Sequence, residues 1–248
     1  MEPLKLAKRL LPACLRLSAG ERRRISSAVL AKALALGASQ VGIASVQAIS
    51  TSPSHRKSCV LWPPAARSVI VVALAHPPSR PADDWWDGKA GRTAGNRRLI
   101  RICSDLADDL RATWGIQAWR MAYTVGRGGL FVKDAAVLAG LGCIGRNNLL
   151  VTPAHGPRVR LGAVMVTVAL PSSRPSTFAP CDACHAPCQA ACPQGAFPSG
   201  IYAWQRCNAQ MQKDVAEGTP VRSAEERLEV NRCIKYCRAC ELACPVGR

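Results

Sequence analysis

Hydrophobic and polar positions along the first two thirds of the chain follow two periodicities, one helical and one extended. Along 96–114 apolar side chains recur on one helical face, at Leu99, Ile102, Cys103, Leu106 and Leu110. This spacing predicts an amphipathic helix. The β-branched run 68–75 is bounded by turn signals and predicts a buried strand. A second long apolar run follows at 160–170.

Shorter segments fill the space between these elements. We predict a helix over 25–36 that Gly37 ends, a strand over 41–46, a helical stretch at 135–139 and an extended one at 149–152. The segments 50–64 and 76–92 are rich in Pro, Ser, Gly or Asp and predict loops, the second carrying Trp85 and Trp86. Helices and strands thus alternate, and we expect an α+β protein whose N-terminal part is an α/β domain.

Proline, serine and threonine are concentrated in 171–180, and everything after that segment is organised around cysteine. We therefore expect four parts: a basic N-terminal helix or extension (1–24), an α/β cofactor-binding domain (25–170), a linker (171–180) and a cysteine-rich domain (181–248). The N-terminus lacks a clean apolar core and a cleavage site, so we predict no signal peptide. No stretch is long and apolar enough to span a membrane.

Charge is distributed unevenly along the chain. The formal net charge is +17, from 33 Lys and Arg against 16 Asp and Glu. Nine basic and seven acidic residues fall in 171–248, which leaves a net charge of +15 for 1–170. A basic domain of this kind attracts RNA, an anionic cofactor or an acidic partner protein. A solvated basic surface without a partner explains the charge equally well, so charge alone names no ligand.

Thirteen cysteines are many for 248 residues. Without a signal peptide we expect a cytoplasmic protein, and in a reducing compartment clustered cysteines hold metal more often than they form disulfides. Two motifs carry most of them. The first is Cys181-x2-Cys184-x3-Cys188-x3-Cys192-Pro193, and the second is Cys237-x2-Cys240-x3-Cys244-Pro245.

Each motif ends in C-x3-C-P, the tail of the bacterial two-cluster ferredoxin run, in which the last cysteine ligates the other cluster. Exchange of the last cysteines predicts two [4Fe–4S] clusters. The first is held by Cys181, Cys184, Cys188 and Cys244, and the second by Cys192, Cys237, Cys240 and one more thiol. Spacing leaves Cys207 and Cys233 as candidates for that place. Zinc is the alternative metal for C-x2-C pairs, but the two Cys-Pro tails favour iron–sulfur clusters.

Three stretches of the sequence resemble the epoxyqueuosine reductase family, relatives of the corrinoid-dependent reductive dehalogenases. They are 36–44 (LGASQVGIA), 139–149 (AGLGCIGRNNL) and the two cysteine motifs. The family follows its Cys-Pro-x-Gly-Ala segment with an Arg-Cys that ligates the second cluster. Arg206-Cys207 matches that Arg-Cys, so the resemblance favours Cys207 over Cys233.

The resemblance also implies a cofactor and a fold. Family members bind a corrinoid, here cobalamin, in a nitroreductase-like N-terminal domain beside a ferredoxin-like module, and the clusters pass electrons to the cobalt. On this basis we expect the glycine turn, with Gly142, Gly145 and Asn147, beside the cofactor. An electron donor of the ferredoxin or flavodoxin type is implied, with tRNA or an acidic protein as further partners.

Two departures from the family matter for activity. Counting back without gaps, Gly126 stands where the reductases carry a general-acid Asp. The chain stops four residues after Cys244, so we expect it to lack the RNA-contacting helical repeats usual in those reductases. Both departures favour an alternative function, a ferredoxin-like electron-transfer protein that reduces a separate corrinoid partner. A third hypothesis, an RNA-binding protein with structural clusters, lacks an interleaved aromatic and basic platform.

Several single residues have both a chemical and a structural interpretation. Residues 140–145 match the dinucleotide fingerprint G-x-G-x-x-G, but the predicted helix precedes and the strand follows it, the reverse of a nicotinamide site. A glycine turn for close packing is the alternative. Asp134 is either a displaced general acid or a helix N-terminal acid. Tyr123 and Cys143 are further candidates, with packing roles as their alternatives.

Overall fold

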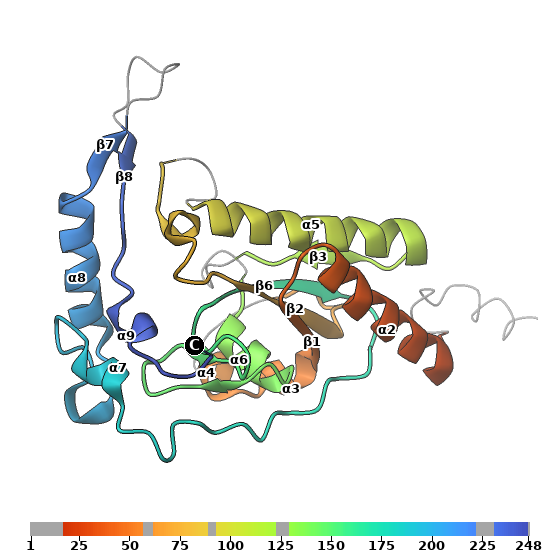
Figure 1. Cartoon of the computed structure of the whole chain (residues 1–248). Coiled ribbons are helices and arrows are strands. Elements are labelled where there is room, and N and C mark those ends of the chain that lie inside the picture. The colour runs from red at the N-terminus through yellow and green to blue at the C-terminus, as the bar shows by residue number, and fades with distance from the viewer. Residues whose placement is uncertain (1–16, 57–61, 89–92, 123–128, 222–230, 248) are drawn as a thin grey trace, which may run out of the picture.

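A computed structural model describes residues 17–56, 62–88, 93–122, 129–221 and 231–247. Its centre is a four-stranded sheet in the order β1-β2-β6-β3 (Figure 1). The strands are β1 (Gln40–Ser45), β2 (Ser68–Ala75), β6 (Val159–Val166) and β3 (Ala118–Arg120). Every neighbouring pair is antiparallel. The alternation of helices and strands in the sequence therefore produces a mixed fold without a parallel sheet.

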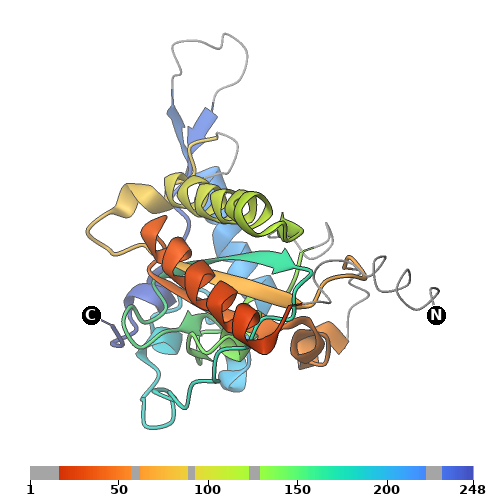
Figure 2. The same ribbon diagram turned by 90° about the vertical axis from the view of Figure 1, so that its right-hand side faces the viewer.

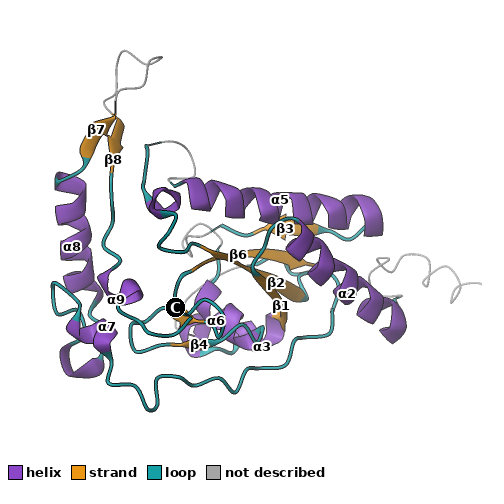
Figure 3. Ribbon diagram, in the orientation of Figure 1, coloured by secondary structure: helices purple, strands orange, loops and turns teal. Residues whose placement is uncertain are grey.

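Helices cover both faces of this sheet (Figure 3). α2 (Ala19–Ala35) and α5 (Ala94–Trp114) pack together over one face (Figure 2). α3 (Val46–Ser50) and α6 (Val132–Leu138) pack against the other. Because side chains alternate along a strand, Ile70, Val72 and Leu74 enter the first layer and Val69, Val71 and Ala73 the second. This explains why β2 is a continuous apolar run.

Local signals set the ends of the two long helices. Ser18 caps α2, and its hydroxyl and the Glu21 carboxylate form a capping box. Thr93 caps α5 through a bond from the Asn96 N–H. Gly115 ends α5 with φ +61°, a left-handed conformation that favours glycine.

After β6 the chain has no helix or strand until Pro187. Ser173 ties this segment to the edge of the sheet by exchanging two hydrogen bonds with the backbone of Ile43 in β1. The rest, residues 181–247, is called the cysteine module below. It contains α7 (Pro187–Ala190), η4 (Pro198–Gly200), α8 (Trp204–Ala216), β7 (Thr219–Val221), β8 (Asn231–Cys233) and α9 (Ala239–Leu242).

Most predicted elements are present, with shifted ends. The 68–75 strand is confirmed, and the 96–114 helix begins two residues early, at Ala94. The first helix begins at Ala19, earlier than predicted, so the predicted boundary at residue 24 falls inside α2. The loop predicted over 50–64 is partly wrong, because it contains α4 (Pro53–Arg56). The loop predicted over 76–92 contains a short 3-10 helix, η2 (Pro81–Asp84).

Some predictions fall outside the described residues. The first sixteen residues of the predicted N-terminal helix, Tyr123 and Gly126 are among them. Within the described ranges, no helix has both the length and the apolar character that crossing a membrane requires.

Candidate metal centre

The first group of thiols lies where the cysteine module meets the turn after α6. Cys181, Cys184, Cys188 and Cys244 line one pocket together with Asn147 and Val151. Val151 belongs to β5 (Leu150–Val151), which pairs with β4 (Cys143–Ile144). The structure thus brings together the four cysteines predicted to hold the first cluster, although Cys244 is far from the others in sequence.

The extra residue of the first motif is accommodated at Ala186, the cap of α7. This alanine has φ +54° and ψ +51°, the left-handed region that alanine rarely adopts. Pro187 then begins α7, which carries Cys188 and packs against α9. Cys188 and Cys244 are buried. Burial, and then the neighbouring thiol of Cys244, raises the pKa of Cys188.

The second group of thiols surrounds the start of α8. Cys240 is affected by the charges of Cys237, Cys192 and Cys207, so these four side chains are neighbours. Burial is the larger influence and, with these neighbours, raises the pKa of Cys240 to about 12. Cys207 is in α8, whereas Cys233 lies in β8 and is not among the thiols that act on Cys240. The structure therefore brings Cys207 into the second group.

Hydrogen-bond donors point at the sulfur atoms of this second group. The backbone N–H of Ala196 donates to Cys192 Sγ at 3.3 Å, and that of Ala239 donates to Cys237 Sγ at 3.5 Å. Tyr202 forms a side-chain hydrogen bond with Cys207. Such bonds stabilise negative charge on sulfur and are one of the means by which a protein sets a cluster's reduction potential.

The thiols of the first group line a common pocket and do not converge on one point. Across the residues that the structure describes, no three His, Cys, Asp or Glu side chains are close enough to hold a single metal ion. Four thiols at the corners of a cubane are farther apart than four ligands of one ion, so the donor sets fit clusters. The described cysteines form no disulfide.

A buried arginine holds the C-terminal end of the module. The Arg158 guanidinium donates to the carbonyl oxygens of Glu241 and Cys244, both at 3.3 Å, and to that of Val246. Gly156 packs against the same tail, because a Cβ there would lie 2.0 Å from the Val246 oxygen. Arg158 therefore positions Cys244, the last cysteine of the first group, from the sheet side.

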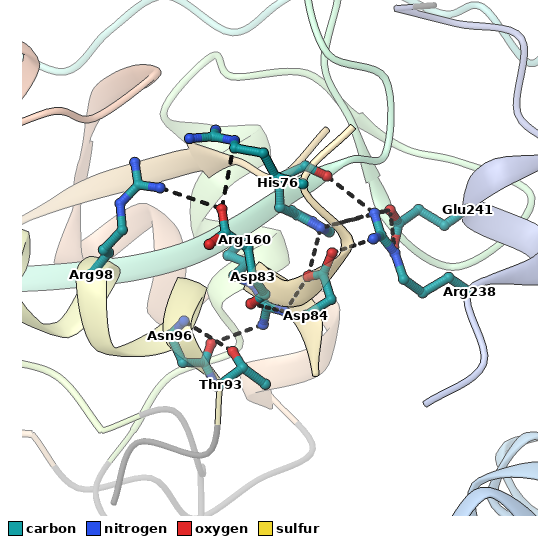
Figure 4. A network of polar contacts seen from close by, with 10 residues as sticks. His76, Asp83, Asp84, Thr93, Asn96, Arg98, Arg160, Arg238 and Glu241 are labelled. Carbon is teal, nitrogen blue, oxygen red and sulfur yellow. Dashed lines mark hydrogen bonds and ion pairs between the residues drawn. The ribbon is translucent and has the colours of Figure 1, made fainter. Parts of the chain in front are cut away.

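A second buried network joins the sheet to the second thiol group (Figure 4). Asp84, 8% exposed, accepts bonds from Arg160 and from Arg238, which lies between Cys237 and Cys240. His76 Nδ1 lies 2.9 Å from Asp84 Oδ1, and Glu241 also pairs with Arg238. Burial alone would raise the pKa of Asp84, but the bond from His76 and the surrounding positive charges outweigh it and hold that pKa below its ordinary value.

Trp85 and Trp86, in the loop after β2, form a further contact between the two parts. Trp86 exchanges two backbone hydrogen bonds with Ile234 and stacks on Tyr236 at 6.1 Å between ring centroids. Lys235 lies 4.3 Å from the centroid of the Trp85 ring. Trp85 and Trp86 were predicted only as loop residues, and the structure makes them part of the interface with the cysteine module.

The residues predicted to bind a cofactor lie against the first thiol group. A Cβ on Gly142 would be 2.1 Å from the Val151 oxygen, and one on Gly145 would be 3.5 Å from Cys181 Sγ. The buried Asn147 donates to the Cys240 oxygen at 3.4 Å. These contacts favour a glycine turn that allows close packing. β4 and β5 follow α6 here, the reverse of the dinucleotide-binding order.

Asp134 takes part in a chain of hydrogen bonds that joins the α4 region to the start of α6. The Phe131 N–H donates to His55 Nε2, so the neutral ring carries its proton on Nδ1 and donates to Ser52 Oγ. The Ser52 hydroxyl then donates to Asp134 Oδ2 at 3.0 Å. Burial lowers the pKa of His55, and Asp134 opposes this only in part. Asp134 lies in the first turn of α6, where the helix dipole favours an acid.

Cys143 lies beside the first thiol group. Burial raises its pKa, followed by the charges of Cys181 and Asp182, with Cys244 adding less. Since it is not one of the cysteines lining the pocket, we assign it a packing position at the edge of the group.

An apolar cavity of about 250 Å³ opens between α5, β3 and β6. Its walls are mostly aliphatic, with Arg120 and Cys103 among them. Asp134 and the turn residues Gly142, Gly145 and Asn147 do not line it. This cavity is smaller than the roughly 300–1,000 Å³ typical of pockets for drug-sized ligands.

Sequence reasoning missed the charged residues that join the two parts. Arg158 and Arg160 flank the start of an otherwise apolar strand, and Asp84 lies in a predicted loop. Two arginines entering a buried strand are a signal that could have marked this interface, since buried charges need partners. Their partners, at 238–246, could not have been named from the sequence.

Known proteins similar to this chain are epoxyqueuosine reductases and, in fold, reductive dehalogenases. No family model matches the chain. An epoxyqueuosine reductase from Synechococcus sp. is 28% identical over 234 residues, covering 91% of this chain and 67% of that protein. One from Synechocystis sp. is 31% identical over 137 residues, covering 54% of this chain and 47% of that protein. The sequence is thus similar to epoxyqueuosine reductases over most of its length.

Solved structures show the same fold. An epoxyqueuosine reductase solved with an epoxyqueuosine-modified tRNA-Tyr stem loop has a TM-score of 0.64 and 21% identity, covering 90% of this chain and 65% of its own. A catabolic reductive dehalogenase has a TM-score of 0.61 and 18% identity, covering 93% and 33%. The chain thus spans about two thirds of one curated reductase and about half of the other.

Proposed function

We propose that this chain is an iron–sulfur oxidoreductase of the epoxyqueuosine reductase type. Two [4Fe–4S] clusters in a ferredoxin-like C-terminal module would pass electrons to a corrinoid at the N-terminal part. The observation that carries the proposal is the exchange of cysteines between the motifs. Cys244 joins the thiols of the first motif, and Cys192 joins Cys207, Cys237 and Cys240.

The donor sets fit the proposed clusters. Each group offers four thiols, the number that a [4Fe–4S] cluster takes. Free thiols with raised pKa values stay protonated near neutral pH, so cluster assembly must displace their protons. The chain's own contribution is to hold the thiols in place through Arg158 and the α7–α9 contact, and to direct N–H groups at Cys192 and Cys237.

The fit for a corrinoid is partial. The apolar cavity of about 250 Å³ takes an apolar edge or side arm of such a group, and the whole macrocycle is larger. A related dehalogenase is described as B12-dependent, which supports the corrinoid proposal. When bound, a corrinoid supplies a strongly reducing cobalt centre. We propose tRNA as the macromolecular partner, since a relative was solved with a tRNA stem loop and the net charge is +17.

Anaerobic purification with metal analysis tests the proposal. We expect about eight irons per chain, from two four-iron clusters, and uptake of about one equivalent of added cobalamin, followed by absorption spectroscopy. Binding of a tRNA stem loop should weaken steeply with added salt, because phosphate contacts release counterions. Zinc in place of iron would contradict the proposal, because it requires two iron–sulfur clusters.

A second candidate function is an electron-transfer protein that reduces a separate corrinoid protein. The small cavity favours it, as does the glycine at position 126, which lies outside the described residues. Eight irons with no cobalamin uptake, together with cluster-dependent reduction of an added corrinoid protein, would select this candidate.

A further inference from the structure

The apolar cavity beside α5 exists because one strand of the sheet is much shorter than its neighbour. β6 has eight residues, whereas β3 has three and pairs only with 164–166. Within the described ranges, residues 159–162 of β6 therefore have no strand beside them on that edge of the sheet. α5 packs over both strands (Figure 1). The space left between these elements is the cavity of about 250 Å³.

The walls of this cavity are aliphatic and come from both layers of the core. Leu99 of α5 belongs to the layer on one face of the sheet, and Leu130 and Val132, around the start of α6, belong to the other. Gly162 of β6 also lines the cavity, and a Cβ on it would lie 2.8 Å from Cys103 Sγ in α5. An apolar cavity of about 150 Å³ binds benzene, so this larger one suits an apolar body of about six to eight carbon atoms.

One charged side chain lines this otherwise apolar cavity. Arg120 ends β3, and its side chain is exposed. Because side chains alternate along a strand, it lies on the α5 side of the sheet, as Ala118 does. No carboxylate among the residues that the structure describes pairs with Arg120, whereas Arg97, Arg98 and Arg160 each have one.

Cys103 is the other titratable side chain of the cavity wall, and it stays neutral. Burial raises the pKa of this thiol to about 12, and the charge of Arg120 opposes that rise only in part. The influence of Arg120 on the thiol also indicates that the guanidinium lies near the cavity. The cavity therefore combines an apolar interior with one positive charge that no described side chain neutralises.

We propose that this cavity binds a small monocarboxylic acid whose apolar body has about six to eight carbon atoms. The aliphatic walls take the hydrocarbon part, whose removal from water favours binding. The Arg120 guanidinium takes the carboxylate at the mouth, because its planar set of N–H donors matches the two oxygens. The inference goes beyond the proposed function, since every wall belongs to the sheet and its helices and none to the cysteine module.

Isothermal titration calorimetry of the anaerobically purified full chain tests the inference. The titration is made without added cobalamin, because the proposed corrinoid would reach this cavity with an edge. Octanoate should bind saturably, with a stoichiometry of about one per chain. Octylamine has the same hydrocarbon chain and the opposite charge. It should bind about tenfold more weakly than octanoate, because its ammonium group meets Arg120 as a like charge.

Two variants separate the charge from the cavity. Arg120→Gln should weaken octanoate binding about fivefold, a modest loss because solvent screens part of the attraction of an exposed guanidinium. Val132→Phe should weaken it by at least about tenfold, because the larger side chain fills the space. Arg101→Gln is the matched control. It removes the same charge from an exposed position of α5 that does not line the cavity, so binding should change by less than about twofold.

Several outcomes would overturn the inference. Equal affinity for octanoate and octylamine, or equal losses in Arg120→Gln and Arg101→Gln, would show that Arg120 does not select the charge of the ligand. Unchanged binding in Val132→Phe would place octanoate outside the cavity. If Val132→Phe fails to fold, the two arginine variants still decide, since both side chains are exposed. An iron-loaded chain that binds no octanoate would contradict this inference alone, and an iron-free chain that binds it would contradict only the proposed function.

Discussion

The sheet and the cysteine module are held together by different forces. In the sheet, apolar side chains from α2 and α5 fill one layer and those from α3 and α6 the other, so that β2 is buried on both faces. In the described part of the cysteine module, the buried apolar residues are only Cys188, Ala196, Ile234 and Cys244. Two of these four are predicted cluster ligands.

This difference indicates how each part gains its stability. Burial of apolar area is the main favourable term in folding, and the sheet has ample area of that kind. The module has little, and small modules of this kind depend on metal or disulfides. The described cysteines form no disulfide, so under the proposed function the cluster–thiolate bonds and the contacts with the sheet would supply its stability.

The largest expected effect is that of removing iron. Treatment of the purified holoprotein with an oxidant and a chelator should abolish amide protection in 181–221 and 231–247, while β2 and α5 keep theirs. Hydrogen exchange followed by mass spectrometry measures both parts in one experiment. If the module kept its amide protection, or if both parts lost theirs equally, the module would not depend on iron in the way proposed.

Next in size is the replacement of a single ligand. Cys244→Ala should lower the iron content from about eight to about four per chain, because one cluster loses a thiolate. Iron analysis and absorption spectra measure the loss. Cys233→Ala is the matched control, since Cys233 lies in β8 apart from the second group, and it should retain about eight irons. The opposite pattern would show that the two groups are wrongly assigned.

The same difference explains what the sequence could predict. The spacing of apolar residues predicted β2 and α5. A strand buried on both faces is a continuous apolar run, and a helix buried on one face has apolar residues every three or four positions. The start of α2 could also have been predicted, since Ser18 and Glu21 have the S-x-x-E spacing of a capping box. Cysteine spacing marked both thiol groups, with the choice of Cys207 resting on the resemblance.

Contacts between segments that are distant in sequence could not be predicted in this way. The antiparallel order β1-β2-β6-β3 depends on how the strands pair, which local periodicity does not encode. Asp84 and Arg238 are separated by more than half of the chain, and each looks like an ordinary charged loop residue in isolation. The turn at Gly142 matches the dinucleotide fingerprint G-x-G-x-x-G, but that motif indicates a dinucleotide site only between a strand and a helix, in that order.

A third prediction concerns the contact between the two parts. Asp84→Asn should lower the free energy of unfolding by about 3–5 kcal/mol, because it leaves Arg160 and Arg238 buried without their anion. Denaturant titration followed by tryptophan fluorescence and by cluster absorption measures the change. Asp83→Asn is the control. Its ion pairs with Arg80 and Arg98 are more exposed, so the cost should be about 1 kcal/mol or less.

The pH dependence of this pair follows from the lowered pKa of Asp84. A carboxyl whose pKa is lower in the folded state stabilises that state above its ordinary pKa, and the contribution is lost as pH falls through the folded value. The difference between wild type and Asp84→Asn should therefore narrow as pH falls below the ordinary value of 3.8. A difference that keeps its full size well below that pH would contradict the lowered pKa of Asp84.

The smallest expected effect is at the extra residue of the first motif. Ala186 holds a left-handed conformation that costs alanine about 1 kcal/mol and glycine almost nothing. Ala186→Gly should therefore stabilise the first thiol group and raise the midpoint of thermal cluster loss by about 2–4 °C. Ala190→Gly, inside α7, should lower that midpoint by a similar amount, since glycine is unfavourable within a helix. If both glycines lowered it, the module would owe its local geometry to the bound cluster and not to the backbone preference of Ala186.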